Sequence, residues 1–385
     1  MVDILLYLRT IKEKTIDMKN FHINGHGHVL PGPDQIPDSI KKAGYFDLVP
    51  SLNDPKQLMM TQKFKDWSRP VTDNTFFAEA QVEWMSKWNI DHTIVITLSQ
   101  LYCNGLPENI TYDIISFQND FQLQLQELYP SKFTCGFVVQ PLYLDHALRE
   151  IEKRHKEGLS FLCLPTNYKD SEGGWTTSTD ESCQEIYSLA NDLGLAVQLH
   201  PYDYEDIIML KNRHRRWPGH ILSMPYLSAE LWQEFIYEEI DLACPRARFA
   251  FSHGNMFSFA TIGRKTHGYY GRPDLYRGCN RAPGYALNAT NMFYDSIVHD
   301  FKSIDFMMDK ISHKQIIAGY DTPYPLGEVD GVKDSIYPGV TLDGAESLGY
   351  INSSQKVDIK GKNVSSWLYG DNYQAIEDFY KRIKS

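Results

Sequence analysis

Two histidines separated by one glycine follow an apolar segment near the start of the chain and could hold one metal ion. They are His26 and His28, in the stretch Phe21–Pro31. In an extended strand, alternate side chains point to the same face, so both imidazoles can reach one ion. Two imidazoles are half of a common zinc site. Because the chain has 13 histidines in 385 residues, such a triplet can arise by chance, and the interpretation depends on further ligands.

Further ligands stand at the ends of other apolar segments. His200 ends one such segment, His253 follows another, and Asp321 follows a third. In a barrel of parallel strands the carboxyl ends of all strands meet on one face, so these side chains would converge. Imidazoles and one carboxylate suit Zn²⁺, with Mn²⁺ and Fe²⁺ as alternatives. No strand end offers a lysine, which favours one metal over two. Of the remaining histidines only His299 has a comparable position, and the others are interpreted as surface or structural residues.

The elements that position these residues alternate between strands and helices. The predicted strands are Phe21–Gly25, His92–Leu98, Phe133–Val139, Leu159–Leu164, Leu195–Leu199, Arg248–Ser252, Met292–Asp295 and Gln315–Gly319. The predicted helices include Asp113–Leu128, Asp145–His155 with Asp145 as its cap, Asp180–Leu193 and Asp305–Ile311. About eight βα units predict an α/β fold, a (β/α)8 TIM-like barrel. An open doubly wound sheet is the alternative, and the lack of an early G-x-G-x-x-G weakens its nucleotide-binding form.

The chain reads as one barrel domain over residues 21–385, preceded by an extension over residues 1–20. Residues 31–73 do not fit the repeat and are interpreted as an insertion after the first strand, a small lid or β subdomain. Pro201–Ile240 and Tyr324–Gly370 also depart from the repeat and read as long connections of the kind that often hold an active site. Trp367–Ser385 predicts a closing amphipathic helix, a C-terminal helical tail.

Composition narrows the range of partners. The net charge of −11 and the pI near 5.6 argue against nucleic acid and against an anionic membrane surface. No apolar run approaches the ~18 residues of a membrane span. The six cysteines form no C-x-x-C pair and mostly lie in apolar runs, which favours buried free thiols and a cytoplasmic location.

The motifs resemble a known family. The chain is similar to the decarboxylase branch of the metal-dependent amidohydrolase superfamily, and within it to the 2-amino-3-carboxymuconate-6-semialdehyde (ACMS) decarboxylase family. The resemblance covers roughly residues 21–330. It rests on Gly25–Pro31, Leu199–Asp203, Phe251–Gly254, Gly271–Leu275, Phe293–Asp300 and above all Gly319–Glu328.

The resemblance implies a role for several residues. His26, His28, His200 and Asp321 match the family's Zn²⁺ ligands, and His253 matches its catalytic histidine; Asp321 is thereby also a catalytic residue. Arg69 matches an arginine that binds a substrate carboxylate. Arg264 matches one that reaches into the neighbouring subunit, which implies a homodimer. Tyr202 stands in the substrate pocket where the family often has tryptophan, and Asn255-Met256 replaces a glycine run.

The implied function is non-oxidative decarboxylation of ACMS, in tryptophan (kynurenine) catabolism. The metal-bound water and His253 would handle the proton, and two guanidiniums would fit a small anionic substrate, a dicarboxylate. Three alternatives stay open at this point. They are a decarboxylase of a hydroxybenzoate-type acid, a lactone or amide hydrolase of the same superfamily, and a degenerate barrel without turnover.

Overall fold

Eight parallel strands form a barrel at the centre of the molecule. The computed structural model describes residues 21–71, 76–202, 219–329 and 336–385, so the predicted extension over residues 1–20 lies outside them. The barrel strands, in spatial order, are β1 (Ile23–Gly27), β5 (His92–Val95), β6 (Phe133–Val138), β7 (Phe161–Pro165), β10 (Ala196–His200), β11 (Arg248–Phe251), β12 (Met292–Asp295) and β13 (Ile316–Ile317). This confirms the predicted strand positions and the barrel rather than an open sheet.

The barrel closes between its first and last strands. The Gly25 N–H donates to the carbonyl of Ala318 at 2.6 Å, and Gly27 forms a parallel bridge with Thr322. A side chain at Gly25 would collide with that carbonyl, since its Cβ would lie 2.6 Å from the oxygen. Closure therefore brings the histidines that follow Gly25 next to the residues that follow β13.

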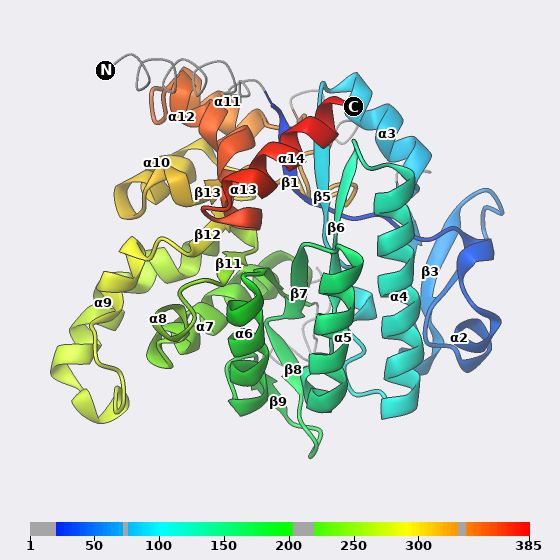
Figure 1. The fold of residues 1–385 in the computed structure, drawn as a ribbon, viewed down its shortest axis with the longest axis horizontal. Coiled ribbons are helices and arrows are strands. Elements are labelled where there is room, and N and C mark those ends of the chain that lie inside the picture. The colour runs from blue at the N-terminus through cyan, green and yellow to red at the C-terminus, as the bar shows by residue number, and fades with distance from the viewer. Residues whose placement is uncertain (1–20, 72–75, 203–218, 330–335) are drawn as a thin grey trace, which may run out of the picture.

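Alternating residues of each strand serve two separate cores. Phe161 and Cys163 of β7 pack inside the barrel, whereas Leu162 and Leu164 pack against the helices around it. The helices are α2 (Asp38–Ala43), α3 (Ala78–Lys87), α4 (Glu108–Leu128), α5 (Leu144–Glu157), α6 (Glu181–Leu193), α7 (Met224–Tyr237), α8 (Ile240–Ala243), α9 (Met256–Gly271), α10 (Phe301–Lys310), α11 (Val340–Ser347), α12 (Ser353–Val357), α13 (Asn363–Tyr369) and α14 (Tyr373–Lys384). In Figure 1, α4, α5 and α6 cover one side of the barrel, and α9 extends away from it.

Three helices begin earlier than predicted, each for a local reason. Helix α4 begins at Glu108 because Pro107 precedes it and has no N–H to satisfy. The prediction that Asp145 caps α5 is wrong, since a 3-10 turn over Pro141–Tyr143 runs directly into the helix. Helix α10 begins at Phe301 because the Asp300 side chain accepts a hydrogen bond from the Ser303 N–H.

The insertion after β1 is a small antiparallel sheet beside the barrel. Its strands are β2 (Asp47–Pro50), β3 (Leu58–Gln62) and β4 (Trp67–Val71), preceded by α2. Figure 1 shows it on the outer side of α4. A second addition, the hairpin of β8 (Asn167–Lys169) and β9 (Trp175–Thr177), follows β7. The predicted β subdomain is therefore present.

The segment after β13 is helical, in contrast to the predicted long connection over Tyr324–Gly370. Helix α13 closes the amino-terminal end of the barrel: Trp367 is fully buried against Phe161, with ring centroids 5.3 Å apart. The Arg248 side chain, at the start of β11, donates to the carbonyls of Trp367 and Leu368. The first residues of the segment, up to Glu328, and the start of α11 lie instead near the opposite end, where the strand ends carry the histidines.

All six cysteines are buried thiols that form no disulfide, as predicted. Among the described helices, none combines the length and the apolar character that crossing a membrane requires.

Candidate functional site

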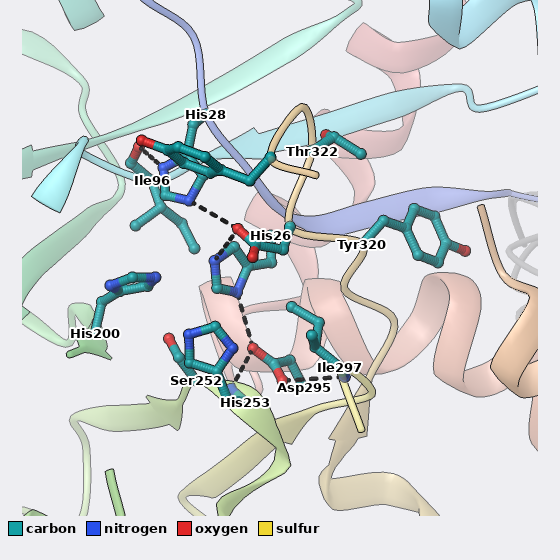
Figure 2. A network of polar contacts seen from close by, with 12 residues as sticks. His26, His28, Ile96, His200, Ser252, His253, Asp295, Ile297, Tyr320 and Thr322 are labelled. Atoms are coloured by element: carbon teal, nitrogen blue, oxygen red, sulfur yellow. Dashed lines mark hydrogen bonds and ion pairs between the residues drawn. The ribbon is translucent and has the colours of Figure 1, made fainter. Parts of the chain in front are cut away.

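Three histidines from two strand ends form a cluster at the carboxyl end of the barrel. His26 and His28 follow β1, and His200 ends β10. All three are buried, and one nitrogen from each lies within 4.8 Å of the others. Figure 2 shows the rings pointing toward a common centre. The structure thus brings together the three predicted imidazoles as a candidate metal site.

In each ring, a contact at Nδ1 holds the imidazole so that its Nε2 faces the centre of the cluster. The Nδ1 atoms face oxygen acceptors: His26 faces Asp295 Oδ2 at 2.8 Å, His28 the carbonyl of Ile96 at 3.3 Å and His200 the carbonyl of Pro201 at 2.6 Å. A neutral imidazole with its proton on Nδ1 presents a bare lone pair at Nε2. Each of the three Nε2 atoms is buried and lacks a hydrogen-bond partner. Such buried atoms are costly when left alone, and a cation is the partner that fits them.

Asp321 lies beside these nitrogens. Its Oδ1 is 3.3 Å from His28 Nε2 and 3.6 Å from His26 Nε2, and its side chain is buried. Burial raises the pKa of Asp321, but the close contact with His28 and the nearby imidazoles outweigh it and hold the pKa well below the usual range. A permanently charged carboxylate at this point can complete a site of three imidazoles and one oxygen.

The backbone around His26 and His28 needs the glycine between them. A Cβ at Gly27 would lie 2.6 Å from Thr93 Cγ2, 3.0 Å from Asn24 Nδ2 and 3.1 Å from Thr322 Oγ1. The strand therefore packs closely against both of its neighbours at this residue. Only glycine therefore fits between the two histidines where the strand passes this close to its neighbours.

His253 stands next to the cluster but outside its tightest group. Its ring centroid is 5.3 Å from His200 and 5.7 Å from His26, and its buried Nε2 lacks a partner. The residue has a φ of 60°, and Gly254 and Asn255 also have positive φ. This left-handed turn after β11 directs the imidazole toward the centre. Burial lowers the pKa of His253.

One carboxylate, which the sequence analysis did not single out, connects His253 to the cluster. Asp295, at the end of β12, accepts hydrogen bonds from the N–H groups of His253 at 3.1 Å and Gly254 at 2.9 Å, while its Oδ2 also meets His26 Nδ1. Figure 2 shows this bridge. Its position at a strand end, inside the barrel, is the signal that could have identified it.

Arg69 and Tyr202 approach the cluster through a chain of polar contacts that sequence reasoning missed. The Arg69 guanidinium lies 4.8 Å from the ring centroid of Tyr324, which is 5.1 Å from that of His28. Tyr324 donates to Gln100 Oε1 at 3.4 Å. Gln62 of β3 donates to the Gln100 carbonyl and accepts from Tyr202 at 3.2 Å. The inserted sheet thus brings Arg69 and Tyr202 to the same side of the site.

Arg264 does not reach this site within its own chain. It is exposed in the middle of α9, the helix that extends away from the barrel (Figure 1). Its predicted place in a neighbouring subunit stays a prediction.

A cavity of about 540 Å³ opens beside His253 and Asp321. Its walls come from the loop after β13, from the loop after β12 and from the start of α7. The volume lies in the range of small-molecule sites. Among its lining residues, Glu328 is buried and accepts a hydrogen bond from the Gly339 N–H at 2.7 Å. Burial raises the pKa of Glu328 to about 7.

Comparisons with known proteins support the fold. No protein-family model matches the chain. By structure it is similar to the 5-carboxyvanillate decarboxylase of Sphingomonas paucimobilis (TM-score 0.70, 14% identity, 90% of this chain and 98% of that chain). It is also similar to a dihydroxybenzoic acid decarboxylase of Polaromonas with bound manganese (TM-score 0.69, 12% identity, 92% and 99%). The fold is that of the amidohydrolase-type decarboxylases.

The sequence comparison is more specific. The chain is 24% identical over 356 residues to the ACMS decarboxylase of Dictyostelium discoideum, covering 91% of this chain and 92% of that protein. It is 24% identical over 407 residues to the ACMS decarboxylase of Caenorhabditis elegans, covering 91% and 97%. The resemblance that the motifs indicated is thereby confirmed.

Replacing the bridging carboxylate tests how the cluster is held. We expect Asp295→Asn to weaken metal binding by roughly 10–100-fold, because the amide no longer holds His26 as a charged acceptor. Metal affinity measured by competition with a chromogenic chelator checks this. Asp309→Asn, an exposed substitution on α10, is the control and should bind metal like the wild type. An unchanged affinity in Asp295→Asn would contradict this account of the site.

Glu328 should make the free energy of unfolding depend on pH. Its pKa in the folded state, about 7, exceeds the unfolded value of 4.5, so the folded protein binds more protons between these pH values. Stability therefore falls as pH rises from 4.5 through 7. Glu328→Gln cannot ionise, so it does not lose stability in this way as pH rises. The unfolding free energy of the variant minus that of the wild type should therefore increase by about 2 kcal/mol from pH 5 to pH 8. Urea titrations at both pH values measure it, with Glu238→Gln as an exposed control; a constant difference would contradict it.

Proposed function

We propose that this protein is a metal-dependent, non-oxidative decarboxylase of ACMS. The observation that carries the proposal is the set of three buried Nε2 atoms, each left bare by an Nδ1 contact on its other side, next to His253. The choice of ACMS rests on the two curated relatives and on the Gly319–Glu328 motif.

His26, His28, His200 and Asp321 would hold the metal. Zn²⁺ suits this donor set, and Mn²⁺, which is bound in a structure of similar fold, suits it as well. A divalent cation supplies Lewis acidity there, which makes the proton of a nearby water available at neutral pH. The side chains of the protein would bind the substrate and move the proton.

Arg69 would bind a carboxylate of the substrate. Its guanidinium can form two parallel hydrogen bonds with a carboxylate, and Tyr324 beneath it holds it toward the cluster. Tyr202, linked to the same side through Gln62, would border the bound substrate. These contacts fix the scissile carboxylate with respect to His253 and exclude alternative poses.

His253 would manage the proton. Histidine is suited to proton transfer near neutral pH, and the left-handed turn after β11 presents its ring toward the centre. A proton is added to the unsaturated carbon that carries the carboxylate. The C–C bond then breaks, CO₂ leaves, and the electron pair restores the double bond. The product has gained one proton and lost one CO₂, so no oxidant or reductant is needed.

Arg264 is assigned a role in a homodimer. It is exposed on a helix that extends from the barrel, which suits a residue that reaches into a second subunit. A cytoplasmic location is proposed because the six buried cysteines form no disulfide.

A second candidate is decarboxylation of a hydroxybenzoate-type acid. It is favoured by the similar fold of the 2,6-dihydroxybenzoate decarboxylase from Rhizobium (TM-score 0.68, 13% identity, 91% of this chain and 98% of that chain). Both candidates need the same metal site and the same proton transfer, and they differ in the substrate.

Turnover of ACMS by metal-loaded protein tests the proposal. We expect loss of the ACMS absorbance with release of one CO₂ per substrate, and a loss of kcat of about 10²–10⁴-fold in His253→Asn. The metal content of that variant, measured by mass spectrometry, should stay near one ion per chain. Inactivity toward ACMS with full metal loading would overturn the choice of substrate, and turnover of 2,6-dihydroxybenzoate in the same assay would support the second candidate.

A further inference from the structure

One tyrosine lies between the candidate metal site and the arginine that would bind the substrate. The centroid of the Tyr324 ring is 5.1 Å from that of His28, and the two rings meet edge to face. The guanidinium carbon of Arg69 lies 4.8 Å from the same Tyr324 centroid. Tyr324 is buried, so its ring has little freedom to move away from either neighbour. The position of Arg69 relative to the metal site therefore depends on this ring.

The backbone of Tyr324 is fixed to the loop that carries Asp321. The Tyr324 N–H donates to the carbonyl of Asp321 at 3.0 Å, and the Gly327 N–H donates to the carbonyl of Tyr324 at 2.8 Å. A Cβ at Gly327 would collide with the carbonyls of Tyr320 and Asp321, so the turn is tightly closed. Because Asp321 is a proposed metal ligand, the tyrosine starts from a fixed point beside the metal site.

The hydroxyl of Tyr324 reaches the inserted sheet by a second route. It donates to Gln100 Oε1 at 3.4 Å, and the Gln100 carbonyl accepts a hydrogen bond from Gln62 Nε2 at 2.9 Å. Gln62 lies two residues after Met60, which is the partner of Arg69 in the antiparallel pairing of β3 and β4. Paired residues and alternate residues share one face of a sheet, so Gln62 and Arg69 point to the same face. Tyr324 therefore contacts the sheet directly at Arg69 and through Gln100 at Gln62.

We propose that Tyr324 is a positioning residue that sets the distance between Arg69 and the metal site and thereby selects the spacing of the two carboxylates of the substrate. This inference rests on the proposed decarboxylation of ACMS, in which the two carboxylates are attached to neighbouring carbons. One carboxylate leaves as CO₂ at the metal site, and Arg69 binds the other. A dicarboxylate with a longer spacing does not make both contacts at once, so it binds more weakly.

A double-mutant cycle tests whether Tyr324 acts through Arg69. Tyr324→Leu removes the ring face, and we expect it to lower kcat/KM for ACMS by about tenfold, the effect of a lost cation–π contact in a desolvated site. In the Arg69→Gln background the same substitution should lower kcat/KM by less than about threefold, because the contact is already lost. A tyrosine that only supports the fold would lower activity equally in both backgrounds.

Two further variants complete the cycle. Tyr324→Phe keeps the buried ring and loses only the hydroxyl donor, so it remains informative even if Tyr324→Leu does not fold. It should lower kcat/KM by about threefold in the wild-type background and leave Arg69→Gln unchanged. Tyr373→Leu, the same substitution at an exposed tyrosine on α14, is the control and should keep wild-type activity. The metal content of every variant, measured by mass spectrometry, should match that of the wild type.

Two inhibitors measure the selected spacing directly. Maleate carries its carboxylates on neighbouring carbons, whereas those of cis-glutaconate are one carbon further apart. We expect the metal-loaded wild type to bind maleate about tenfold more tightly than cis-glutaconate, and Tyr324→Leu to reduce this preference to less than about threefold. Inhibition constants against ACMS turnover give both ratios.

The outcomes separate this inference from the proposed function. Equal losses in both backgrounds, for Tyr324→Leu or for Tyr324→Phe, overturn the role of Tyr324 while turnover of ACMS stands. The same conclusion follows if the wild type does not prefer maleate, or if Tyr324→Leu keeps the full preference. A fully metallated wild type that does not turn over ACMS overturns both proposals.

Discussion

The site depends on one constraint: three imidazole nitrogens face one another inside the protein with no hydrogen-bond partner. Each Nδ1 is committed to an oxygen acceptor, so the ring cannot turn to relieve its Nε2. A buried polar atom left without a partner costs about 1–3 kcal/mol. Three such atoms together are unfavourable unless a cation binds between them. Closure of the barrel between β1 and β13 places His26, His28 and Asp321 side by side. Closing the barrel therefore also assembles the metal site.

Asp295 extends this constraint to the proton chemistry. The same carboxylate meets the His26 ring and the backbone of His253, so the metal site and the proposed proton carrier share one support. Beyond His253 the surroundings divide into two regions. Arg69, Tyr202 and Tyr324 lie on the side of the inserted sheet, and the apolar cavity with His299 lies on the side of the loops after β12 and β13.

Much of the barrel and of the cluster could be predicted from the sequence, because both depend on local patterns. Apolar strand segments end in His26, His28, His200 and Asp321, and parallel strands necessarily bring their ends together. The residues that hold this cluster in place were less predictable, since Asp295 and Gln62 act through contacts with residues distant in the chain. Helices α11 and α12 and the start of α13 were missed for a related reason: α13 is helical because its buried side chains, such as Val364, pack into the barrel end, which glycine-rich composition does not reveal.

The most direct test of the account is the position of the metal itself. Crystals of the protein grown with Zn²⁺ and measured at the zinc absorption edge should show one strong anomalous peak per chain. We predict that it lies about 2.0–2.2 Å from the Nε2 atoms of His26, His28 and His200 and from a carboxylate oxygen of Asp321. A fully occupied ion bound through Nδ1 atoms, or located away from these three imidazoles, would contradict the account.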